Sequence, residues 1–371
     1  MKKLTSVLIV SAMLLAFASC SDNNEPSDSD RSNTSSEAET TATAEKETEE
    51  PTETETKEKS TDAEEDTTAE KNDDKKDGTD IDINNYITVE TPEPALWKAV
   101  DPETGNELYL LGTIHVLSED KFTMPEYLID VYKNCDGIAV EYDIRELETV
   151  SGAQDLLFQM VYTDGTTISD HISEEAYEAG KKCLSDLGIY SSLLDVYMPG
   201  FWVNQIESMA MLSFENLSEN GVDSQFLDMA AEDGKEIVSI ETIEIQAQAM
   251  IGYTDEYADY CLRQLPDDME NLEETAESLG QLYDMWATGD MAALEKLAND
   301  TEGIPEELID DAEAYYDKML YKRNEGMADK AAEFIENGKN YFFMVGVLHF
   351  AGDRGVTALL EDMGYTVERL Y

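Results

Sequence analysis

Two matched segments near opposite ends of the chain place the strongest constraint on its fold. Residues 108–115 read LYLLGTIH and residues 342–349 read FFMVGVLH. In each, an apolar run typical of a buried strand is followed by Gly, two further residues and His. Because Gly permits a sharp bend or a close backbone approach, we expect His115 and His349 to meet where two neighbouring strands end. The alternative is two core or capping histidines, which we disfavour for a matched pair in a chain with only three histidines.

Strand-like and helix-like patterns are unevenly distributed along the chain. Short apolar runs rich in strand formers occur near both ends, whereas helical spacing dominates between about residues 144 and 340. We therefore expect an α/β fold, a single domain at residues 85–371 with a mixed central sheet built from N- and C-terminal strands and a large helical insert. The expected strands are residues 95–100, 107–111, 137–142, 237–240, 341–345 and 365–370.

Residues 22–84 differ in composition from the rest of the chain. They consist mainly of Glu, Thr, Asp, Ser and Lys, so they cannot bury enough apolar surface to fold, and we expect a disordered acidic linker. The whole chain has 83 acidic against 25 basic residues, a net charge of −58. Such a charge repels phosphate backbones, so we expect no nucleic-acid partner.

The N-terminus has the pattern of a bacterial export signal. Lys2 and Lys3 precede an apolar stretch at residues 4–17, which is too short to span a bilayer comfortably. Ala-Ser-Cys20 then resembles a lipobox. We expect a signal peptide at residues 1–19, a lipidated Cys20 and an extracytoplasmic protein that contacts the bacterial cell membrane through this lipid anchor. The alternative is an ordinary signal peptide in which Cys20 is incidental.

Glu141 is the best candidate for a third group beside the two histidines. It lies in the apolar run GIAVEY, where a carboxylate is costly to bury unless it is paired or bound to a cation. Catalytic metal sites commonly use three protein ligands and keep one position open. Two His and one carboxylate suit zinc, manganese, cobalt or iron without selecting one. A solvated strand end remains the alternative for Glu141, and Asp143, on the same face, is a weaker candidate.

These elements together resemble the TraB/GumN family, which includes the Tiki proteins. The resemblance rests on GTIH, on GVLH and on Glu141 between them, and it spans roughly residues 90–371. Further blocks agree with the family pattern, at residues 221–223, 239–246, 323–327 and 346–364. The resemblance implies a fold akin to the erythromycin esterase and ChaN group.

The resemblance also implies an activity, because Tiki members are metal-dependent peptidases that clip residues from a secreted ligand. Carried over, His115, His349 and Glu141 would bind a divalent metal ion. Glu241 would add a ligand or general base, and Arg323 would orient carboxylates or stabilise an oxyanion. The alternatives are a helix N-terminal charge for Glu241 and a salt bridge for Arg323.

Three functions follow as hypotheses. The first is a metal-dependent hydrolase, a peptidase that acts outside the cell on a peptide or protein. The second is a non-catalytic peptide- or haem-binding regulatory lipoprotein of the same fold, and the third is a structural envelope protein.

The chain has no HExxH, GxSxG, Walker or GxGxxG motif, which excludes the corresponding enzyme classes. His171 lacks a strand–Gly context, so we expect a surface or capping residue.

Overall fold

A six-stranded sheet organises the computed structural model, which describes residues 81–118 and 120–371. The strand order is β6-β4-β7-β2-β1-β8. The first four neighbours run parallel, whereas β1 and β8 join antiparallel at one edge. The predicted mixed sheet of N- and C-terminal strands is therefore confirmed. Its strands are β1 Leu96–Val100, β2 Glu107–Thr113, β4 Gly137–Val140, β6 Glu236–Ser239, β7 Tyr341–Gly346 and β8 Thr366–Arg369.

The apolar run of β7 shows why the sheet needs a layer of helices on each face. Tyr341, Phe343 and Val345 belong to one core cluster, and Phe342 and Met344 belong to the other. Because successive side chains of a strand point to opposite faces, both faces of this strand are buried. Continuous rather than alternating apolar strands are typical of parallel sheets with both faces covered.

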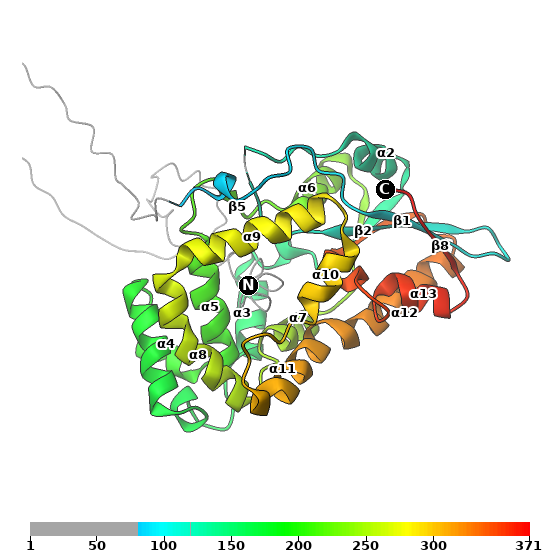
Figure 1. Ribbon diagram of the computed structural model, residues 1–371. Helices are drawn as coiled ribbons and strands as arrows, with labels where there is room; N and C mark the ends of the chain where they lie inside the picture. The colour runs from blue at the N-terminus through cyan, green and yellow to red at the C-terminus, as the bar shows by residue number, and fades with distance from the viewer. Residues whose placement is uncertain (1–80, 119) are drawn as a thin grey trace, which may run out of the picture. The chain divides into compact units, whose positions relative to one another are not determined.

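Helices from distant parts of the chain supply these two layers. One face packs against α12 and α13, and the other packs against α2, α6 and part of the helical insert. Figure 1 shows α12 and α13 together beside β8. The covering helices are α2 Glu126–Asn134, α6 Val222–Asp233, α12 Lys322–Glu336 and α13 Val356–Asp362.

The region between β4 and β7 is mainly helical, as the sequence predicts. Within it α8 packs against both α4 and α5, and Figure 1 shows α4, α5 and α8 grouped together. Two short strands, β3 Leu117–Ser118 and β5 Leu217–Ser218, form a separate antiparallel pair. The helices of the insert are α3 Val150–Gln159, α4 Glu174–Asp186, α5 Pro199–Met211, α7 Ile243–Met250, α8 Asp255–Glu270, α9 Leu272–Ala287, α10 Met291–Ala298 and α11 Ile309–Tyr316.

One stretch of expected regular helix is broken into three pieces. Apolar spacing favours a helix over residues 306–321, but the chain forms a 3₁₀ turn at Glu306–Leu308, then α11, then a π turn at Asp317–Tyr321. The π turn leads directly into α12. Such turns insert an extra residue into the helical ladder and often occur at functional sites.

The predicted signal peptide, Cys20 and residues 22–80 of the predicted acidic linker lie outside the described residues. The lipid anchor and the extracytoplasmic location therefore stay predictions. The predicted end of the linker at residue 84 is too late, because Ile83 is buried in the core and begins the 3₁₀ turn Ile83–Asn85. Among residues 81–118 and 120–371, no helix is both long and apolar enough to cross a membrane.

Candidate functional site

The two Gly-x-x-His segments end side by side. Strands β2 and β7 pair in parallel, with Thr113 opposite Gly346. His115 follows β2 by two residues, and His349 lies in the 3₁₀ turn Val347–Phe350 that follows β7. The sequence therefore correctly predicts that both histidines leave neighbouring strands at the same end.

Gly346 marks the point where the candidate side chains converge. A Cβ atom built on Gly346 would lie 3.2 Å from Glu141 Oε1, 3.6 Å from His349 Cδ2 and 3.7 Å from His115 Nε2. Any larger residue would therefore enter the space between these groups. The glycine is needed here for the close approach of three polar side chains, since the backbone φ of −50° is available to every residue.

His349 has an unpaired ring nitrogen, Nε2, 3.6 Å from Glu141 Oε1. Its Nδ1 lies 2.5 Å from Asn324 Oδ1, and Asn324 Nδ2 donates a hydrogen bond to the Arg354 carbonyl oxygen at 2.9 Å. The hydrogen bond from Nδ2 to the Arg354 carbonyl fixes the orientation of the Asn324 amide, so that its oxygen faces His349. Because this oxygen can only accept, His349 Nδ1 carries the hydrogen. Burial, with the nearby Arg323, lowers the pKa of His349 to about 3. The imidazole is thus neutral, and its buried Nε2 has no hydrogen-bond partner.

His115 is oriented in the same way by a carboxylate. Its Nδ1 lies 3.0 Å from Asp223 Oδ2, in the first turn of α6. Burial by itself lowers the pKa of His115, but the charge and hydrogen bond of Asp223, together with the charge of Glu141, outweigh it and raise the pKa to about 9. With Nδ1 held by Asp223, the other nitrogen, Nε2, faces Gly346.

Glu141 connects the histidines to a buried ionic network. Its Oε1 accepts a hydrogen bond from the Gly346 N–H at 2.6 Å and lies 3.6 Å from His349 Nε2. Its Oε2 accepts a hydrogen bond from Arg323 Nη2 at 2.6 Å. Burial raises the pKa of Glu141, but Arg323 and the two histidines more than offset this, so the pKa stays well below its usual range.

Arg323 joins Glu141 to Glu241. Its Nε and Nη2 donate to the two oxygens of Glu241 at 2.9 and 2.7 Å, and its Nη1 donates to the carbonyl oxygen of Met319 in the π turn. Gln246 donates a further hydrogen bond to Glu241 at 2.6 Å. Burial raises the pKa of Glu241 despite the opposing attraction of Arg323. This arrangement makes Arg323 an orienting group for two carboxylates.

The structure thus brings together all five residues that the sequence singled out, and it adds two more. Asp223 and Asn324 orient the histidines, a role that no sequence motif indicated. Asp143 does not join the site, because its carboxylate binds the Arg145 guanidinium. His171 is also separate, since it caps the 3₁₀ turn Ile168–Asp170.

The donor set fits a divalent cation in type and orientation. Each imidazole has its Nδ1 occupied. The Nε2 of His115 faces Gly346, and the Nε2 of His349 lies 3.6 Å from Glu141 Oε1. The oxygens of Asp223 and Asn324 that contact Nδ1 are of the kind that orient metal-binding histidines. The buried Nε2 of His349 has a lone pair and no hydrogen-bond partner. Even so, the described residues include no set of three or more His, Cys, Asp and Glu side chains already arranged to hold a metal ion.

Comparison with known proteins identifies the family. The model of the TraB/PrgY/gumN family matches residues 95–369, nearly all of the described chain. This chain belongs to that family. No solved structure gives a significant match.

Several curated relatives carry the name metalloprotease. Metalloprotease TIKI2 of Danio rerio is 25% identical over 317 residues, which cover 74% of this chain and 60% of the relative. The metalloprotease TIKI homolog of Amphimedon queenslandica is 28% identical, over 76% of this chain and 62% of the relative. This chain therefore spans about three fifths of the length of these TIKI relatives. At these identities, the names indicate a metalloprotease-like family.

A bacterial relative matches over nearly its whole length. The Escherichia coli (strain K12) protein YbaP, whose name describes it as uncharacterized, is 24% identical over 268 residues. The match covers 71% of this chain and 92% of YbaP. The folded part of this chain is therefore comparable in extent to a bacterial member of the family.

Proposed function

We propose that this protein is a metal-dependent hydrolase, a peptidase that acts outside the cell. The observation that carries the proposal is the convergence of His115, His349 and Glu141 at Gly346, with His349 Nε2 buried and unpaired. The metalloprotease names of the TIKI relatives support the same reaction class. The export signal and lipid anchor expected from the sequence support the location.

His115, His349 and Glu141 are the residues that would hold the ion. A divalent cation there would polarise a carbonyl group and lower the pKa of a bound water. The protein prepares the site for it in two ways. Asn324 keeps the Nε2 lone pair of His349 available, and Arg323 keeps Glu141 ionised. His115, with a pKa of about 9, carries a proton at neutral pH that a cation must displace.

We assign Glu241 and Arg323 to positioning. Every nitrogen of the Arg323 guanidinium donates a hydrogen bond within the protein, to Glu141, Glu241 or Met319. Both oxygens of Glu241 accept hydrogen bonds from this guanidinium. Arg323 and Glu241 therefore fix the position of Glu141. Of these three residues, only Glu141 lies next to Gly346, where the two histidines meet.

Metal content of the purified full-length protein, supplied with zinc, manganese, cobalt or iron, tests the proposal. We expect near-stoichiometric metal in the wild type and loss of it in the His115→Ala/His349→Ala variant. His171→Ala is the matched control and should keep its metal, because His171 lies outside the site. No metal in the wild type would overturn the proposal.

A peptide-cleavage screen with the metal-loaded protein tests turnover. The hydrolase should cleave members of a diverse peptide library, and the double variant should not. Stoichiometric metal with peptide or haem binding but no cleavage would favour the non-catalytic regulatory lipoprotein instead.

A further inference from the structure

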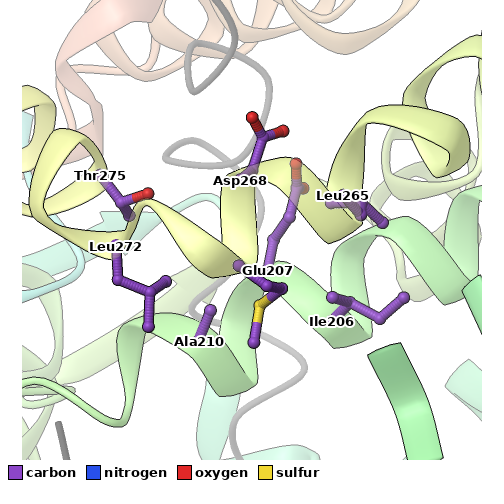
Figure 2. Close-up of a pocket in the computed structure, with 8 residues that line it drawn as sticks. Ile206, Glu207, Ala210, Leu265, Asp268, Leu272 and Thr275 are labelled. Carbon is purple, nitrogen blue, oxygen red and sulfur yellow. The ribbon is translucent and has the colours of Figure 1, made fainter. Parts of the chain in front are cut away.

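A second site lies within the helical insert, where α5 faces the junction of α8 and α9. The groove there contains about 320 Å³ of space that atoms do not fill, part of it open to solvent. Its walls are mostly apolar, and two carboxyl groups interrupt them. Figure 2 shows the Glu207 side chain extending from α5 toward Asp268 on α8. The remaining lining residues are Ile206, Ala210, Leu265, Met269, Leu272 and Thr275.

Glu207 is an unusual residue for such a wall. Its Oε2 is buried and has no hydrogen-bond partner. Burial, together with repulsion from Asp268, raises the pKa of Glu207 well above its usual value. A buried carboxyl group of this kind costs folding free energy unless a cation or a hydrogen-bond donor accompanies it.

The described walls of this groove are acidic and apolar. None of the eight described lining residues is Lys or Arg. The charged neighbour that most affects Glu207 is another acid, Asp268. On the inner side, Glu207 acts electrostatically on the phenols of Tyr253 and Tyr315, which burial keeps neutral by raising their pKa. The groove therefore combines two acidic side chains with mostly apolar walls.

We propose that this groove binds a primary alkylammonium group, either a free aliphatic amine or the lysine side chain of a peptide. The enclosed part has room for a group about the size of a water molecule, which suits a compact ammonium better than a planar guanidinium. The ammonium group contacts Glu207 Oε2, and the alkyl chain lies against Leu265, Leu272 and Ala210. The site does not depend on the proposed metal site or on its activity.

Titration calorimetry of the full-length protein with n-pentylamine tests this proposal, with 1-pentanol as the uncharged match. We expect the amine to bind and the alcohol not to bind. Glu207→Gln should weaken amine binding at least tenfold, whereas Glu270→Gln, an exposed residue at the end of α8, should leave it unchanged. Equal binding of amine and alcohol, no amine binding, or equal affinity of Glu207→Gln and wild type would overturn it.

Two further arms sharpen the result. A blocked Gly-Lys-Gly peptide distinguishes the two sources of the ammonium group. Binding of this peptide indicates a lysine side chain as the ligand. Binding of n-pentylamine without binding of the peptide indicates a free amine. Ala210→Leu fills the groove without touching its charge. It should also weaken amine binding at least tenfold, and thermal unfolding confirms that both variants are folded. Unchanged binding by Ala210→Leu would place the amine elsewhere and overturn the proposal.

Discussion

The Asn324 side-chain oxygen lies 2.5 Å from Nδ1 of His349, and both groups are fully buried. This bond decides which imidazole nitrogen faces Glu141. Replacing Asn324 with Ala frees the ring to rotate and to change tautomer. Because outer-shell partners of metal-binding histidines typically contribute about 10- to 100-fold in affinity, we expect a loss of metal affinity of that order.

Metal titration of Asn324→Ala with a fluorescent chelator as competitor measures this loss. Asn134→Ala is the control, because Asn134 is exposed at the end of α2 and bonds only a local carbonyl with its side chain. Wild-type affinity in Asn324→Ala would show that the bond does not serve the site.

The His115–Asp223 pair predicts a pH dependence of stability. In protein treated with a chelator, the pKa of His115 is about 9, above its ordinary value of 6.5. The folded state then binds the proton more tightly than the unfolded state does. Its stabilisation is complete below pH 6.5 and is lost as the pH rises to about 9, which amounts to about 3 kcal/mol.

Urea unfolding between pH 6 and 10 measures this change in the free energy of unfolding. Asp223→Asn removes the negative charge, so its stability should vary much less over the same range. An NMR titration of the three histidines should show His115 protonated at pH 7.5 in the wild type only. A His115 resonance that titrates near pH 6.5 in both proteins would contradict the prediction.

The sequence predicted the strands and the three converging groups because these depend on local patterns. An apolar run followed by Gly and His is visible within eight residues, and parallel pairing of two such runs aligns their ends. Glu141 follows β4, which pairs with β7 on its other side, so the same sheet edge includes it. To predict that these three groups converge, the only long-range information needed is the order of the strands in the sheet.

The surrounding network could not be predicted in this way. His115 and Asp223 are 108 residues apart, and Arg323 reaches across 182 residues to Glu141. Such contacts depend on how α6, the π turn and α12 pack on the sheet, and no periodicity in the sequence encodes those packing angles. Glu241 illustrates the difference: it precedes the N-cap Thr242 of α7, and its side chain binds Arg323 instead of stabilising the helix terminus.

Gly346→Ala tests the convergence of the site directly. The added methyl group would lie 3.2 Å from Glu141 Oε1 and within 3.7 Å of both imidazoles. We expect at least a tenfold loss of metal affinity with the fold retained, as measured by competition titration and circular dichroism. Gly326→Ala is the matched control, since it lies exposed inside α12 with nothing within 4 Å of its Cβ position. It should keep its metal and gain about 1 kcal/mol of stability.

Arg323→Met tests whether the buried guanidinium holds two carboxylates together. Arg323 is 8% exposed and contacts both Glu141 and Glu241. Its removal leaves Glu141 and Glu241 without the guanidinium that binds both of them, so the free energy of unfolding at pH 7 should fall by about 3 to 5 kcal/mol. Lys182→Met, which breaks an exposed ion pair with Asp186 on α4, should leave the free energy of unfolding nearly unchanged, because solvent screens exposed pairs. Because lower pH protonates the two carboxylates, the deficit of Arg323→Met relative to wild type should shrink between pH 7 and pH 4. A deficit that is independent of pH would show that the loss comes from packing rather than from uncompensated charge.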